Sequence, residues 1–166
     1  TPLHYAALNG HAQIVKILLQ AGAQPTAGDV VASTPLHHAA SGGHPDVIAV
    51  ILGFLSGDMR RQLLTTRNCY GYVPLHVALK RSHVQAAETI LLFGCDINFK
   101  KSDGDTVLHL AAESGNVVVT EFLIQHGANL SVKDRVGQTP LMRAAIAGEL
   151  RIAEMLMKSL NGSNPK

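Results

Sequence analysis

The chain opens on Thr1-Pro2-Leu3-His4, and this four-residue motif returns four more times in intact or nearly intact form. The later copies stand at residues 34–37, 73–76, 106–109 and 139–142. Successive copies begin 33, 39, 33 and 33 residues apart. Because a period in the low thirties is typical of stacked supersecondary units, the sequence predicts a repeat protein.

Each copy of the motif predicts the start of a short helix. Threonine is a favoured N-cap residue, and proline suits the first helical position because its missing N–H would have no partner there. In the first unit the small pair Ala6 and Ala7 follows, which lets the helix lie close to its neighbours, and Gly10 ends it. A similar pattern returns in the other units, with Ser82 at the helix-ending position of the third.

A second helix is predicted in each unit, because apolar residues recur at helical spacing after the helix-ending residue. Ile14, Val15 and Ile17 begin this series in the first unit. A glycine with small or polar residues follows, and an exposed turn such as residues 101–105 or 134–138 leads into the next motif. Each unit is therefore predicted to be helix, turn, helix and hairpin finger.

The five units resemble ankyrin repeats. The resemblance rests on the motif and on the Ala-Ala, Gly-His, Leu-Leu and Gly-Ala pairs that follow it. It implies an all-α fold, an ankyrin-repeat solenoid of helix-turn-helix units joined by β-hairpin fingers, over residues 1–160. The repeats are expected at residues 1–33, 34–72, 73–105, 106–138 and 139–160, with a polar tail at 161–166. Since the first repeat begins at its capping threonine with no finger before it, we expect further chain upstream.

Composition agrees with a repeat protein and argues against several functions. Of the 166 residues 46% are hydrophobic, yet only four are Phe, three Tyr and none Trp, so Leu, Ile, Val and Ala are expected to form the core. A net charge of +2 with dispersed basic residues argues against nucleic-acid binding. No apolar run reaches the roughly 18 residues of a membrane span. We expect an intracellular chain, cytoplasmic or nuclear, that is monomeric by itself.

The nine histidines suggest a metal or acid–base site, but the repeat accounts for eight of them, which are expected to bind backbone groups near turns. His38 alone falls outside the pattern, and it faces a different way from His37 on a helix, which argues against a shared metal. Cys69 and Cys95 lack zinc-site spacing, and a reactive thiol stays an alternative to a structural role. No phosphate-binding loop or recognisable nucleophile is present, so we expect no enzyme activity, cofactor or metal.

The second unit is six residues longer than its neighbours, and the additional residues lie within 53–66. Asp58 is expected to cap a short extra helical turn that holds Leu63 and Leu64. Two interpretations stand. One is a tolerated surface insertion, because loop length costs little free energy. The other is a protrusion that a partner contacts.

The finger after this insertion carries Tyr70 and Tyr72, whereas the next two fingers carry charged, small or aliphatic residues. Tyrosine is enriched at interface hot spots, because its ring buries area while its hydroxyl finds a partner. We expect one of the two rings to pack on the protein and the other to be available to a partner.

Charged residues before the helix-ending turns give a pattern along the groove that the resemblance implies. Lys80 and Arg81 form a basic band, and Asp103, Asp105 and Glu113 form an acidic band after it. Such charges either pair with each other, worth about 0–1 kcal/mol when exposed, or orient a partner. The predicted partner contacts are Tyr70, Tyr72, Lys80, Arg81, Asp103, Asp105, Glu113, Arg135, Gln138 and Arg143.

The resemblance implies a protein-interaction module that binds another protein through its fingers and groove. Two alternatives stay open. Residues 63–76 somewhat resemble a lengthened repeat junction of the inhibitor-of-NF-κB family, whose members retain a transcription factor by covering it, although a strongly acidic tail is absent. The second alternative is that the chain is the targeting arm of a larger enzyme.

Overall fold

The computed structural model describes residues 1–162, and in that range the chain forms eleven helices and no β-strand. It divides into two compact units, Thr1–Asp96 and Ile97–Lys166. The helices of the first unit are α1 (Pro2–Leu8), α2 (Ala12–Gln20), α3 (Pro35–Gly42), α4 (Pro45–Phe54), α5 (Gly57–Thr65), α6 (Pro74–Lys80) and α7 (Val84–Leu92). Those of the second unit are α8 (Val107–Glu113), α9 (Val117–Gln125), α10 (Pro140–Ala147) and α11 (Leu150–Gly162).

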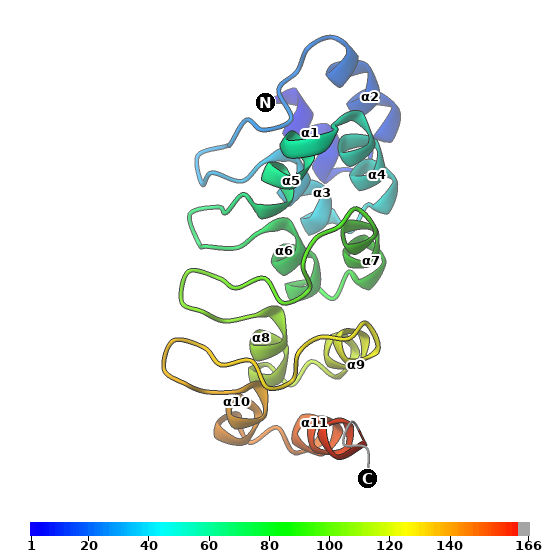
Figure 1. The fold of residues 1–166 in the computed structure, drawn as a ribbon. Coiled ribbons are helices and arrows are strands. Elements are labelled where there is room, and N and C mark those ends of the chain that lie inside the picture. The colour runs from blue at the N-terminus through cyan, green and yellow to red at the C-terminus, as the bar shows by residue number, and fades with distance from the viewer. Residues whose placement is uncertain (163–166) are drawn as a thin grey trace. The chain divides into compact units, whose positions relative to one another are not determined.

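The first unit is built from helix pairs that stack on each other (Figure 1). The helices that start at the motif pack against one another, α1 on α3 and α3 on α6, and the second helices do the same, α2 on α4 and α4 on α7. Leu36, Ala39 and Ala40 of α3 are fully buried at these contacts. The predicted small pair therefore allows close helix packing. Ser82 adopts a φ of 60° at the position where the other repeats have glycine.

The second unit repeats this arrangement with two helix pairs. Helix α10 packs on α8, and α11 packs on α9. Leu108 and Ala112 of α8 are buried together with Ile152 and Leu156 of α11. Helix α11 runs through residue 162, so the first two residues of the predicted polar tail are helical, and its last four lie outside the described residues.

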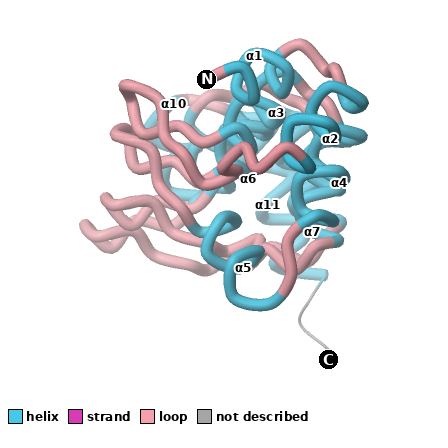
Figure 2. The backbone as a smooth tube through the Cα atoms, turned by 90° about the horizontal axis from the view of Figure 1, so that it is seen from above, coloured by secondary structure: helices cyan, strands magenta, loops and turns pink. Residues whose placement is uncertain are grey.

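Four short turns, here called fingers, precede the motif-bearing helices: residues 29–33, 68–72, 101–105 and 134–138. Each is closed by one backbone hydrogen bond between its end residues, for example 3.0 Å from the Asn68 N–H to the Tyr72 carbonyl. The β-hairpins expected from the resemblance are not confirmed, because the fingers contain no β-strand within residues 1–162. In each unit the fingers project from one side of the helices (Figure 2).

Histidines of the motif fix the fingers to the helices. The Nε2–H of His4, His37 and His109 donates to the carbonyls of Ser33, Tyr72 and Gln138, over 3.0, 3.0 and 3.1 Å. In His37 the other ring nitrogen, Nδ1, accepts the backbone N–H of Thr34 at 3.1 Å, and His109 does the same with Thr106. These rings bind backbone groups, as their place in the repeat predicted, and each joins the start of one repeat to the finger that ends it.

The insertion in the second repeat is a packed helix, α5. Leu63 and Leu64 are buried, as expected, and the Arg60 guanidinium donates to the carbonyls of Leu52 and Leu55 at 2.6–3.1 Å. The helix begins after Ser56, so the expectation that Asp58 caps it is wrong; the Asp58 carboxylate instead pairs with Arg61. The insertion therefore adds buried surface to the first unit.

Candidate partner-binding surface

A pocket of about 400 Å³ opens in the first unit, between the fingers at 29–33 and 68–72 and the helices α3 and α6. Four of the predicted partner residues line it: Tyr70, Tyr72, Lys80 and Arg81. The sequence assigned these residues to a finger and to a groove, and the structure brings them to one concave site. Pockets of this size with a few polar groups are common binding sites.

The two fingers at this pocket are held by side chains at their first positions. Asp29 Oδ1 accepts the backbone N–H groups of Val31 and Ser33, each at 2.9 Å. Asn68 Oδ1 likewise accepts from the N–H groups of Tyr70 and Tyr72, each at 3.1 Å. The Cys69 N–H also donates to the Val31 carbonyl at 2.9 Å, which joins one finger to the other. The pocket rim is therefore preformed.

The second carboxylate oxygen of Asp29 is bound by His38, whose Nε2 lies 2.8 Å away. Burial opposes ionisation of Asp29, but the hydrogen bonds from His38, Ser33 and Val31 outweigh it and lower the pKa of the carboxyl to about 2. The His38 ring also meets the edge of the His4 ring at 5.2 Å. His38, the histidine outside the repeat pattern, thus serves to position the finger at 29–33.

The two tyrosines have different environments, as the sequence predicted. Tyr70 is 63% exposed at the finger tip. The Tyr72 ring is half-buried beneath Lys80, whose Nζ lies 4.8 Å from the ring centroid and donates to the hydroxyl at 3.3 Å. Tyr70 is therefore the more exposed of the two rings, and Tyr72 is the ring that contacts Lys80.

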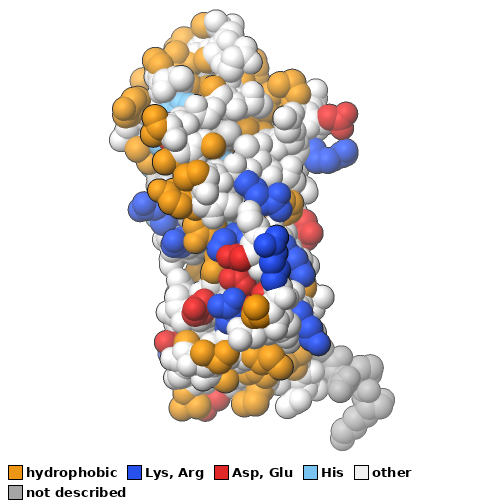
Figure 3. Space-filling model, turned by 90° about the vertical axis from the view of Figure 1, so that its left-hand side faces the viewer, with side chains coloured by type: hydrophobic (Ala, Val, Ile, Leu, Met, Phe, Trp, Pro, Cys, Tyr) orange, Lys and Arg blue, Asp and Glu red, His pale blue; other side chains and the backbone are white. Residues whose placement is uncertain are grey.

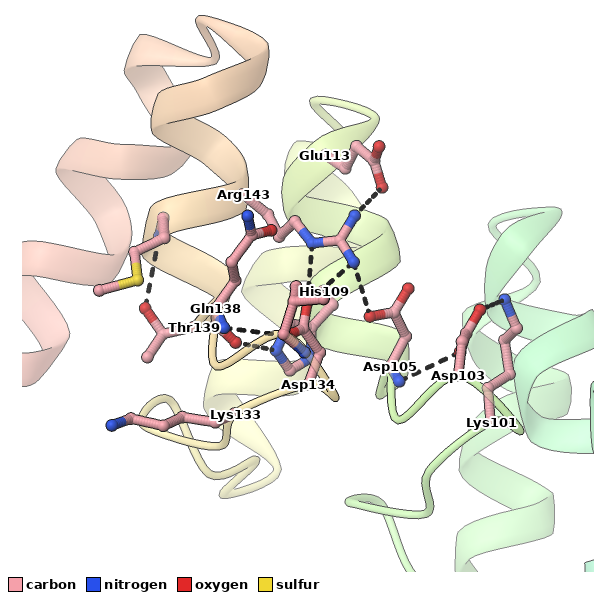
Figure 4. Close-up of polar contacts among 12 residues, drawn as sticks. Lys101, Asp103, Asp105, His109, Glu113, Lys133, Asp134, Gln138, Thr139 and Arg143 are labelled. Carbon is pink, nitrogen blue, oxygen red and sulfur yellow. Dashed lines mark hydrogen bonds and ion pairs between the residues drawn. The ribbon is translucent and has the colours of Figure 1, made fainter.

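In the second unit the predicted charged residues form an ion cluster around Arg143 (Figure 4). The guanidinium contacts Asp105 at 3.0 Å, Glu113 at 3.2 Å and Asp134 at 2.8 Å. Asp105 is only 4% exposed, so it is not the surface carboxylate that the acidic band implied. Burial raises the pKa of Asp105 more than the Arg143 charge lowers it. The cluster joins the fingers at 101–105 and 134–138 to α8 and α10 and leaves little of Arg143 or Asp105 for a partner.

The remaining predicted residues lie around this cluster. Asp103 pairs with Lys101 at 2.5 Å, and Arg135 is exposed at the next finger. The Gln138 backbone is engaged on both sides, because its N–H donates to Asp134 and its carbonyl accepts from His109. The structure therefore separates the ten predicted residues into a pocket in the first unit and a polar cluster in the second.

Other chemistry has little support in the part of the chain that the structure describes. No group of three or more His, Cys, Asp or Glu side chains there is arranged to hold a metal ion. Burial raises the pKa of the Cys95 thiol to about 12, so this thiol stays protonated. None of the described helices is both long and apolar enough to cross a membrane.

Comparison with known families identifies the repeats. A model of three ankyrin repeats matches residues 29–101 and 87–166, and a model of a single ankyrin repeat matches residues 1–30. The chain belongs to the ankyrin-repeat family. Ankyrin repeats are generally protein-interaction modules and are not catalytic in themselves. The more specific resemblance to inhibitor-of-NF-κB proteins stays a hypothesis.

A curated relative carries similar repeats within a much longer chain. The chain is 31% identical over 106 residues to the tyrosine-protein kinase HTK16 of Hydra vulgaris. The match covers 64% of this chain but 14% of that kinase. Because so little of the kinase is matched, the activity in its name is not transferred to this chain.

Sequence reasoning missed Asp29 and His38, although the repeat carries a signal for them. Asp29 stands five residues before Thr34, the motif threonine of the second repeat, and His38 stands four residues after it. Asp134 and Arg143 have the same spacing around Thr139, and their side chains are also bonded. An aspartate at the first finger position with a basic residue just after the motif thus predicts a bond that fixes the finger in this ankyrin array.

Replacing Arg143 with Met tests whether the ion cluster stabilises the second unit. The substitution keeps the length of the side chain but removes the cation from Asp105 and Asp134, whose side chains are nearly inaccessible. Because a carboxylate left without its partner in a buried site is costly, we expect Tm to fall by about 5 °C. Thermal unfolding followed by circular dichroism measures this, and Arg135→Met, at an exposed finger position, is the matched control. An unchanged Tm for Arg143→Met would mean that the cluster adds no net stability.

Proposed function

We propose that this chain is a protein-interaction module that binds its partner through the pocket between the fingers at 29–33 and 68–72. The observation that supports this most directly is the convergence of Tyr70, Tyr72, Lys80 and Arg81 on one concave site. These residues come from a finger and from the end of α6, the two places where ankyrin repeats present side chains to partners.

Tyr70 is the proposed anchor. Its ring is exposed, while its backbone N–H is bonded to Asn68, so the side chain projects from a finger of fixed conformation. A partner that covers the ring gains buried area without the cost of ordering the finger. Tyr72, Lys80 and Arg81 form the adjoining wall. We do not include Asp105, Glu113 or Arg143 in this surface, because they are occupied with one another.

Tyr70→Ala is the test of this function. We expect Tm to stay within a few degrees of wild type, because the ring has little packing to lose, while partner affinity falls about tenfold or more. The measurement is affinity capture from cell lysate with identification by mass spectrometry, followed by titration of the captured partner. Tyr5→Ala is the matched control, since Tyr5 is 71% exposed and does not line the pocket. Equal capture by wild type and Tyr70→Ala would place the interface elsewhere.

A second candidate function is supported by the relative. Since the matched kinase contains a similar stretch within a longer chain, this chain is alternatively the targeting arm of a larger enzyme. The full-length transcript distinguishes the two candidates, because a catalytic domain in the same open reading frame supports the targeting arm. Its binding surface would be the same pocket.

A further inference from the structure

We propose that the pocket in the first unit takes an acidic side chain, Asp or Glu, from an extended segment of the partner, with its carboxylate between Lys80 and Arg81. This inference rests on the proposed function and specifies the chemistry of the segment that binds. The argument uses the charges of the pocket, the position of Lys80, and a contrast with Arg143.

The pocket has basic groups without an internal counter-ion. Asp29 is the only carboxylate that lines it, and both of its oxygens are occupied, Oδ1 by the N–H groups of Val31 and Ser33 and Oδ2 by His38. Within the first unit no carboxylate lies within ion-pair distance of Lys80 or Arg81. Two exposed cations at the pocket wall are therefore available to an incoming carboxylate.

The sequence around these cations is one-sided in charge. Between Asp58 and Glu88 there is no acidic residue, while five basic residues occur there: Arg60, Arg61, Arg67, Lys80 and Arg81. Figure 3 shows exposed Lys and Arg side chains, some of them beside Asp and Glu side chains. A surface of one sign attracts a segment of the opposite sign and raises its rate of association.

Lys80 is held in place before any partner arrives. Its ammonium lies over the Tyr72 ring at 4.8 Å and donates one hydrogen bond to the Tyr72 hydroxyl at 3.3 Å. An ammonium has three N–H donors, so two of them remain for an acceptor in the pocket. Because the stem is already positioned, a carboxylate that binds it loses little to side-chain ordering.

Arg143 in the second unit shows the opposite arrangement. Its guanidinium is already surrounded by the carboxylates of Asp105, Glu113 and Asp134, so its charge is compensated within the chain. The protein therefore compensates a cation internally in one place and leaves two exposed beside a pocket in another. A ligand carboxylate would supply the missing negative charge beside Lys80 and Arg81.

A peptide segment fits this pocket better than a nucleic acid does. Nucleic-acid sites present a basic stripe that follows many phosphates, often with several stacking aromatics. Here only two cations, Lys80 and Arg81, line the pocket, and Tyr70 is the single exposed ring on its wall. A peptide that carries a carboxylate next to an apolar or aromatic side chain can contact both the two cations and the Tyr70 ring.

The test is selection of peptides from an unbiased display library on the purified chain, followed by titration of the enriched peptides as synthetic, fluorescently labelled probes. We expect the enriched peptides to share an Asp or Glu. We expect Lys80→Glu/Arg81→Glu to abolish their binding, and a rise in salt from 50 to 500 mM to weaken it about tenfold. Lys16→Glu is the matched control, because Lys16 is exposed on α2 and outside the pocket. An Asp→Asn or Glu→Gln peptide tests the carboxylate itself.

The outcomes separate this inference from the proposed function. Peptides that lose binding on Tyr70→Ala but carry no shared acidic residue would overturn the acidic segment and leave the binding surface intact. Peptides that ignore Tyr70→Ala, or an absence of enriched peptides, would overturn both. A single-stranded oligonucleotide that competes as well as the acidic peptides would also overturn the inference, since binding would then depend on negative charge alone.

Discussion

Replacing His37 with Ala is expected to lower the free energy of unfolding by about 3–4 kcal/mol, from two unpaired backbone groups and a cavity. His37 is 1% exposed, and its ring joins the start of the second repeat to the finger that ends it. The substitution leaves the Tyr72 carbonyl and the Thr34 N–H without the ring nitrogens at 3.0 and 3.1 Å. The bond to Thr34 is buried and the bond to Tyr72 is partly buried, so the loss exceeds that of an ordinary exposed hydrogen bond.

Urea denaturation at pH 7 measures this loss, and His126→Ala is the matched control. His126 is exposed and bonds a carbonyl of its own helix, so its removal should change stability by less than 1 kcal/mol. Since repeat arrays unfold in part locally, hydrogen exchange should show the His37→Ala effect at residues 34–80 first. Equal stability of the His37→Ala and His126→Ala variants would mean that the contacts of the His37 ring add no net free energy of unfolding.

The helices and the role of the histidines could be predicted from the sequence because both depend on local patterns. The spacing of the motif defines where helices begin, and the recurrence of His4, His37 and His109 at one register position indicates a structural role. The β-hairpins are a different case. Each finger is a five-residue turn with one backbone hydrogen bond between its end residues and one inside it, which makes no strand, and the number of such bonds is not visible in the repeat.

The candidate site could be predicted only where its residues are close in sequence. Tyr70 and Lys80 lie within ten positions of each other, and the sequence pointed to both. Asp29 reaches the same pocket from the end of the first repeat and His38 from the start of the second, so their contribution depends on how repeats stack. Asp105 shows the reverse error, because an aspartate in a predicted exposed turn is covered by Arg143 from a segment 38 residues away.

Mild acid is expected to destabilise the first unit, and His37 supplies the reason. Burial lowers the pKa of His37 from 6.5 to about 4, and the hydrogen bond to the Tyr72 carbonyl only partly opposes this. Between these two values the unfolded chain binds a proton at this residue and the folded chain does not. The contribution is therefore fully present above pH 6.5 and is lost as the pH falls towards 4, by up to about 3 kcal/mol.

The contacts of the ring explain why protonation is costly. Nε2–H donates to the Tyr72 carbonyl, and Nδ1 accepts the Thr34 N–H, so both nitrogens of the neutral ring are in use. A proton on Nδ1 removes the acceptor and places two donors opposite each other in a buried site. Asp29 does not act in the same range, because its pKa of about 2 confines its loss to below about pH 4.

Urea denaturation between pH 7 and 4.5 tests this with wild type and a His37→Gln variant, which keeps a hydrogen-bonding side chain but cannot titrate. We expect wild type to lose stability steadily below pH 6.5 and the variant to lose less over the same range. A matched slope in both proteins would assign the acid sensitivity to other groups. Since His37 holds the carbonyl of Tyr72, hydrogen exchange at the finger 68–72 should accelerate in acid in wild type and accelerate less in the His37→Gln variant.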